Sequence, residues 1–184
     1  MATELGPKHL EMLRGMAPKV TRVAVLVHPA NASHALLLKN VQAAAQKLDV
    51  KILPVEASTP QEIANGFAVI ARQNAGALIV SLEGLFIQQR NQIAELAAKQ
   101  RLPTIGAYGE YVEAGGLMSY GQNIGENYRR AATYVDKILK GANPGDIPVE
   151  QPMTFELFIN RKTANALGLK ISNTMLVQAT KVIQ

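Results

Sequence analysis

The chain has 184 residues, of which 48% are hydrophobic, and a formal net charge of +5. This length and composition predict a folded domain with its own core and exclude a disordered chain. The lysines and arginines are scattered, without a basic stripe or a recognition motif, so nucleic acid is not an expected partner. Cysteine is absent, which excludes disulfides, thiolate metal sites and a cysteine nucleophile.

The first residues combine neither the charged region nor the apolar region of an export signal. No later stretch approaches the roughly 20 apolar residues that cross a membrane. From the residues alone we expect a soluble chain that does not span a membrane and carries no export signal.

An apolar strand, a polar turn and an amphipathic helix repeat four times between Val20 and Gly121. Thr59 is expected to cap one of these helices, and Glu62 to reach back to the cap amide. The repeat predicts an α/β fold in three layers, a parallel sheet with helices on both faces. The expected strands are 20–27, 50–55, 77–81, 103–107 and 117–120, and the expected helices are 3–16, 33–48, 60–73, 85–100 and 110–113.

After Gly121, which we expect to turn the chain away from the sheet through a positive φ, the pattern changes. A long helix over 124–140 should stop at Gly141. Then follow a turn at 143–146, extended segments at 147–149 and 155–159, a short helix ending at Gly168 and a last helix over 173–183.

The carboxyl ends of the parallel strands should share one rim, where open α/β folds bind ligands. At the first strand end, Pro29, Asn31 and Ser33 precede a helix whose amides favour an anion such as a carboxylate. Asn31 and Ser33 have capping as their other role.

Further rim candidates follow the later strands. Ser81, Glu83 and Phe86 follow the third strand, and Glu83 either receives a ligand ammonium or stabilises the helix start. Tyr108 and Tyr111 either stack on a planar ligand or pack at the edge of the core. Asn123 either caps the next helix or contacts ligand.

No catalytic, metal or cofactor site emerges from the residues. The three histidines fall on different expected elements, without clustered carboxylates, so no metal site is expected. There is no phosphate-binding lysine motif or dinucleotide fingerprint, so no cofactor is expected. His28 with Ser81 is the one conceivable catalytic pair, and an enzyme ranks third among the functions considered.

Several stretches together resemble one family, the substrate-binding proteins of ABC transporters related to tryptophan- and tyrosine-binding lipoproteins. The resemblance covers essentially the whole chain. It rests on Gly115 to Gly121, Tyr128 to Ala132, Ile138 to Gly141, Ile147 to Pro152, Phe158 to Ala164 and Ala166 to Leu169.

The resemblance implies one lobe of a type I periplasmic-binding-protein clamshell, present as the C-terminal half. It divides the chain into an N-terminal helix and linker (1–19), a ligand-binding second lobe (20–121), a helix crossing to the first lobe (122–146) and a returning segment (147–184). The exposed hinge side of a lone half predicts a homodimer.

The function that the resemblance implies is reversible binding of a small solute for an ABC importer. The solute would be an amino acid or an aromatic or apolar organic molecule, handed to permease subunits in the periplasm or outside the membrane. Glu83-Gly84 departs from the Asp-Pro of many relatives, at the ligand's polar contact. The alternative is a homodimeric sensory or interaction domain without a transport role.

Overall fold

The computed structural model describes residues 2–150 and 154–184. Within these residues seven strands form one sheet, in the order β2-β1-β3-β4-β5-β6-β7. The strands are β1 (Arg22–Val27), β2 (Lys51–Glu56), β3 (Ala77–Val80), β4 (Thr104–Gly106), β5 (Met118–Gln122), β6 (Phe155–Asn160) and β7 (Lys181–Ile183). The helices are α1 (Ala2–Met16), α2 (Ala32–Lys47), α3 (Pro60–Arg72), α4 (Gly84–Gln88), α5 (Arg90–Lys99), α6 (Gly109–Glu113), α7 (Ile124–Leu139), the 3₁₀ turn η1 (Pro144–Asp146), α8 (Arg161–Leu167) and α9 (Asn173–Gln178).

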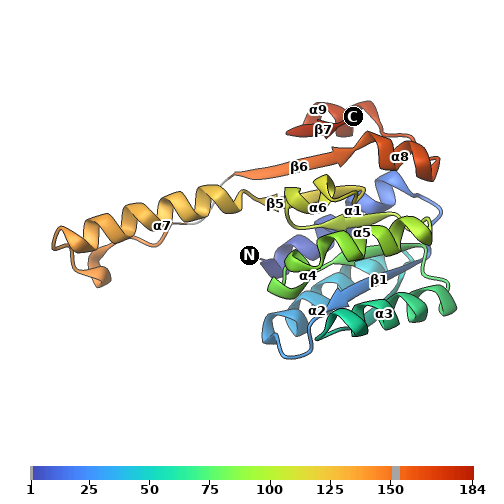
Figure 1. Cartoon of the computed structure of the whole chain (residues 1–184), viewed down its shortest axis with the longest axis horizontal. Coiled ribbons are helices and arrows are strands. Elements are labelled where there is room, and N and C mark those ends of the chain that lie inside the picture. Colours follow the sequence, from blue (N-terminus) through green and yellow to red (C-terminus); the bar gives the residue numbers. More distant parts are fainter. Residues whose placement is uncertain (1, 151–153) are drawn as a thin grey trace.

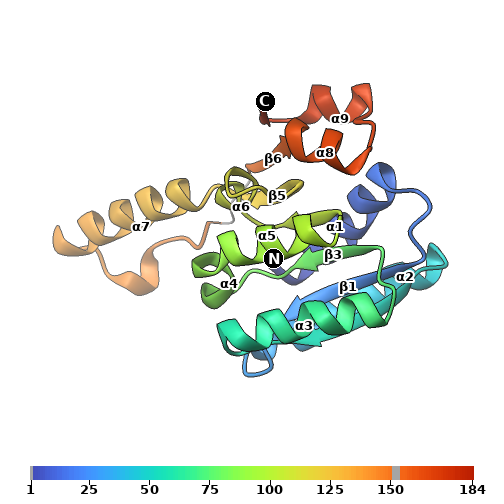
Figure 2. The same ribbon diagram turned by 45° about the vertical axis from the view of Figure 1, so that its right-hand side comes forward.

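The sheet is mostly parallel, and helices cover both of its faces (Figures 1 and 2). Strands β1 to β5 are parallel to one another, as the repeat predicts. Strand β6 then pairs antiparallel with β5, and β7 pairs parallel with β6. The α/β class is therefore confirmed, and the C-terminal segment adds two strands of mixed direction to the parallel set.

Alternate residues of the buried strands feed two separate cores. Val23 and Val25 of β1 belong to the core that includes residues of α1 and α2, such as Leu10 and Val41. Ala24 and Leu26 point the other way, into the core formed with α3 and α5. A strand covered on both faces needs apolar residues at every position, which explains the unbroken apolar run of β1.

Four local expectations are wrong. The helix expected over 85–100 is two helices, α4 and α5, which meet at Gln89. The helix expected over 173–183 ends at Gln178, and 181–183 form β7. This happens because Thr180 bonds Leu157 of β6 twice, donating N–H to the carbonyl at 2.8 Å and accepting the Leu157 N–H on Oγ1 at 3.1 Å.

The other two concern single side chains. Thr59 caps α3, but Glu62 accepts from the N–H of Ser58 and not from that of the cap itself. Gly121 has no positive φ. It lies inside β5, where an added Cβ would strike the backbone carbonyl of Ala107, so close approach and not a turn requires glycine there.

Helix α7 leaves the sheet and projects from the body (Figure 1). We call residues 124–150 the arm. None of the residues of α7 is buried, and its exposed apolar side chains include Tyr128, Val135 and Leu139. Residues 147–150 belong to no helix or strand. At the base of the arm, the rings of Tyr120 and Phe155 stack with centroids 5.6 Å apart.

Candidate functional site

The loops after β1 and β3 meet at the carboxyl-end rim of the sheet, through Asn31 and Glu83. Asn31 Nδ2 donates to Glu83 Oε2 over 2.8 Å. Each residue also caps a helix, since Asn31 Oδ1 accepts from Ser33 N at 3.0 Å and Glu83 Oε1 accepts from Gly84 N at 2.9 Å. The capping role that the sequence left open is thus present in both side chains, and both lie at the rim where ligand contact is expected.

The carboxyl group of Glu83 is stabilised in its ionised form. The hydrogen bond from Asn31 is the main reason that its pKa lies below the usual value, although partial burial opposes the shift. The Gly84 amide and the nearby rings of His28 and His34 act in the same direction. Glu83 therefore places a negative charge at the rim at neutral pH.

Two further predicted residues flank this pair. Ser33 is exposed, and its hydroxyl donates to Asn31 Oδ1 at 2.6 Å. Pro29 is exposed in the preceding loop. Asn31, Ser33 and Glu83 form one polar group at the N-terminus of α2, where the backbone amides and the helix dipole favour an anion.

Ser81 lies beneath the rim. Its side chain is buried, and its Oγ has no hydrogen-bond partner among the residues that the structure describes. The ring of His28 instead accepts the N–H of Ala30 on Nδ1 at 3.2 Å. The described residues therefore do not form the hydrogen bond between His28 and Ser81 that a nucleophilic pair would use.

The aromatic candidates lie in the core and not at the surface. Tyr111 and Phe86 are fully buried and Tyr108 is 2% exposed. The hydroxyl of Tyr108 donates to the Phe86 carbonyl at 3.0 Å, and that of Tyr111 to Thr104 Oγ1 at 2.8 Å. Burial raises the pKa of both phenols. With their hydroxyls satisfied and their faces covered, these rings offer no stacking surface in this conformation.

Asn123 lies at the base of the arm, beyond the end of β5. Its Oδ1 caps α7 by accepting from Glu126 N at 2.8 Å, and its Nδ2 donates to Glu156 Oε1 at 2.9 Å. It lines a hollow of about 150 Å³ with Glu110, Glu113 and Glu156. The Asn31–Glu83 pair is not among the residues that line this hollow.

Sequence reasoning missed His34. It is 4% exposed in the first turn of α2, with its ring between the loops after β1 and β3. The signal was available in the helical spacing, because His34 precedes the buried residues Leu37, Val41 and Ala45 on one face.

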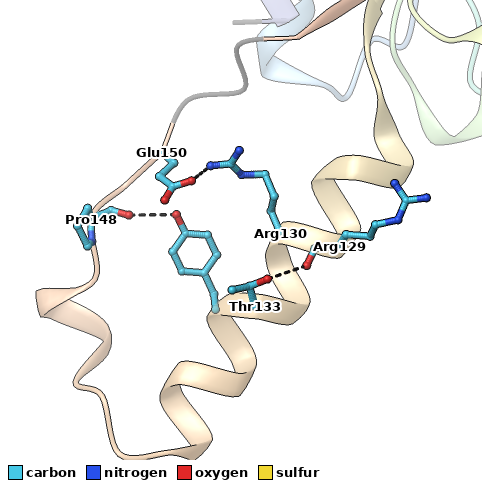
Figure 3. Close-up of polar contacts among 6 residues, drawn as sticks. Arg129, Arg130, Thr133, Pro148 and Glu150 are labelled. Carbon is cyan, nitrogen blue, oxygen red and sulfur yellow. Dashed lines mark hydrogen bonds and ion pairs between the residues drawn. The ribbon is translucent and has the colours of Figure 1, made fainter.

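Side chains of α7 hold the returning segment of the arm (Figure 3). Arg130 forms an ion pair with Glu150, and the hydroxyl of Tyr134 donates to the Pro148 carbonyl at 3.1 Å. Both side chains, with Thr133 and Lys137, line a hollow of about 180 Å³. The arm is thus internally bonded although it projects from the body.

Two features are absent from the described part of the chain. Among the side chains that the structure describes, no three His, Asp or Glu come together in a way that could hold a metal ion. No helix in that part of the chain is long and apolar enough to cross a membrane.

Comparison with protein families identifies the class of protein. The family model described as "ABC transporter substrate binding protein" matches residues 3–183. This match covers nearly the whole chain, so the chain belongs to that family. No curated protein matches the sequence.

Solved structures share the fold at low identity. A conserved domain protein from Vibrio cholerae is 24% identical, with a TM-score of 0.88 over 96% of this chain and 60% of its own. The ABC domain from Streptococcus pneumonia, in complex with L-Trp, is 22% identical, with a TM-score of 0.88 over 98% and 62%. A ligand-free, open substrate binding protein with adhesive properties from Clostridium difficile is 22% identical, with a TM-score of 0.70 over 96% and 59%. The chain therefore spans about three fifths of the length of these proteins.

Proposed function

We propose that the chain is the solute-binding component of an ABC importer and binds a small solute at the Asn31–Glu83 rim. The observation that carries the proposal is the hydrogen bond between these two side chains at the ends of β1 and β3. Ligands of open α/β sheets bind at this edge. A fixed carboxylate beside a helix N-terminus supplies one site for a cation and one for an anion.

An amino acid is the solute that suits this pair of charges. Glu83 would accept the ammonium group, and the dipole at the N-terminus of α2 would attract the carboxylate. The L-Trp complex of the Streptococcus protein supports this class of solute, since that protein shares the fold. An aromatic or otherwise apolar side chain would need a surface other than the buried rings of Tyr108 and Tyr111.

The binding cleft would be completed by a second lobe. On this proposal residues 20–121 are the core of the ligand-binding lobe, 122–146 cross to the other lobe and 147–184 return. The exposed apolar side chains of α7 support the crossing, because no residue of this helix is buried against the described residues. Permease subunits would receive the solute on the outer side of the membrane, and no catalytic step is involved.

The second candidate is a homodimer that forms through the same arm. The exposed apolar side chains of α7, Tyr128, Val135 and Leu139, form an apolar stripe. A second copy of the chain would cover this stripe and remove it from water. In that case the domain would act in sensing or interaction and not in transport.

The test is the thermal stability of the chain with a panel of amino acids and aromatic acids. A solute at 100 times its Kd should raise Tm by about 5 to 10 °C. Glu83→Gln removes the charge that binds the ammonium group and should abolish the shift. Glu62→Gln is the matched control, because Glu62 accepts a backbone N–H at another strand-end loop. A shift that survives Glu83→Gln, or none with any member of the panel, would contradict a solute site at this rim of the chain.

A further inference from the structure

His34 connects the two loops that carry the Asn31–Glu83 pair. Its Nδ1 lies 2.9 Å from the amide nitrogen of His28, and its Nε2 lies 3.3 Å from the carbonyl oxygen of Leu82. An amide N–H only donates and a carbonyl only accepts, so this network assigns the neutral ring a proton on Nε2. The buried imidazole thus bonds one loop as an acceptor and the other as a donor.

The two connections between the loops lie on different sides of the same junction. Strands β1 and β3 are adjacent, with Leu26 opposite Val80 at their ends. His34 joins the following loops from the buried side, and the half-buried Asn31 and Glu83 side chains join them nearer to solvent. Without the hydrogen bonds of His34, the Asn31–Glu83 hydrogen bond would be the remaining one of these two connections between the loops.

We propose that His34 is a positioning residue for the solute site, which holds Asn31 and Glu83 in place only while its ring is neutral. This inference rests on the proposed function, because it assigns how the same site is held.

Protonation would reverse one of the two bonds. A proton on Nδ1 removes the acceptor for the His28 N–H. The protonated Nδ1 of His34 would instead donate to the carbonyl oxygen of His28, which lies 3.2 Å away. The amide of His28 then lacks its bond, and the loop that carries Asn31 must shift.

The effects of other titratable groups near His34 must be distinguished from the effect of His34 itself. His28 is on the same loop, and Glu83 is on the neighbouring one. Helix α1 packs on α2 and carries Lys8 and Glu11, which pair with each other, and His9, which bonds the Tyr120 carbonyl. His28 is the second imidazole on these loops, so its effect must be distinguished from that of His34.

The experiment is an NMR titration of the protein without ligand between pH 8 and 5. Long-range proton–nitrogen spectra report the tautomer and charge of each imidazole, and amide spectra report the His28 N–H and the Asn31 side chain. We expect the Nε2–H tautomer of His34 at pH 8. The His28 and Asn31 signals should then move with the same midpoint as the His34 ring. Exchange of the His28 amide, corrected for pH, should become about fivefold to tenfold faster at pH 5.

Two variants assign the effect. In His34→Asn, Oδ1 replaces Nδ1 as an acceptor that cannot be protonated, so the pH response of His28 and Asn31 should disappear. In His28→Asn the second imidazole is removed and an acceptor for Ala30 N–H is kept, so the response should persist. Should His34→Asn not fold, the shared midpoint in the wild-type protein decides alone. An Nδ1–H tautomer at pH 8, or a His28 amide that ignores the His34 titration, would overturn the proposal.

L-Tryptophan is the probe for the link to binding. Its affinity should fall severalfold from pH 7.5 to 5.5 in the wild-type protein and in His28→Asn, and stay constant in His34→Asn. Affinity that falls equally in His34→Asn would overturn the positioning role. The spectra need no ligand, so a failure of the proposed function, with no solute bound at all, is distinguishable from a failure of this inference.

Discussion

His9 on α1 donates its Nε2 proton to the carbonyl oxygen of Tyr120 on β5, over 2.6 Å. The ring is buried, and this burial lowers its pKa from 6.5 to about 4 although the hydrogen bond opposes the shift. The N-terminal helix is thereby fixed to the strand that leads into the arm.

His9 should make the fold sensitive to acid. Its folded-state pKa is depressed, so its contribution is complete above pH 6.5 and is lost as the pH falls toward about 4. The loss should reach about 3 kcal/mol at most. Urea unfolding of wild type and His9→Gln between pH 7.5 and 4 measures it, since Gln does not titrate. Parallel pH curves for the two proteins would contradict this prediction.

Gly121→Ala should destabilise the protein by about 3 kcal/mol, the upper part of the range for overpacking. The new Cβ would meet the backbone carbonyl of Ala107, which cannot rotate away as a side chain can. Gly84→Ala is the control, because nothing lies within 4 Å of a Cβ there. Chemical unfolding decides, and equal stability of the two variants would disprove the close approach.

Tyr108→Phe and Tyr111→Phe should each cost about 1 kcal/mol without changing solute affinity. Each variant loses one buried hydrogen bond, to Phe86 and to Thr104 respectively, and neither ring reaches the surface. Urea unfolding and calorimetric titration with L-tryptophan test both statements. Weaker binding by Tyr108→Phe at unchanged stability would instead place that ring in the solute site.

Val135→Asp should abolish self-association of the chain and leave its stability within about 0.5 kcal/mol of wild type. Val135 is 55% exposed on a helix without buried residues, so the body of the protein does not depend on it. Arg129→Asp adds a carboxylate on the same helix away from the stripe and is the control. Mass measurement across the micromolar range decides, and a wild-type monomer throughout would exclude the dimer.

Most of the fold could be predicted from the sequence because buried parallel strands read as apolar runs. Residues 173–183 show the limit of this approach. Helix α9 does begin at its Ser172 cap, but the last residues form a strand because β6 offers them a partner. Such pairing depends on a distant segment and leaves no local pattern. The direction of β6 was hidden for the same reason.

Some residues of the candidate site could be placed from the sequence and others could not. Asn31 and Glu83 could be placed at the rim because each lies in the loop that follows a strand end. The aromatic residues could not be placed from the sequence. Helix α6 has only 5 residues, and so short a helix does not show by its spacing which face packs inward. Tyr111 was thereby proposed as a ligand contact although it fills the core. His34 was overlooked because histidine on an apolar helical face looks like ordinary packing.

The arm separates two strands that are direct partners. Met118 pairs with Ile159 and Gln122 with Phe155, so β5 and β6 form a hairpin whose connection is the arm. The ladder between these strands therefore needs no residue of α7. We therefore expect the arm to unwind while the sheet stays intact, and its amides to exchange with solvent long before those of β5. The arm would then be a separate cooperative unit from the sheet.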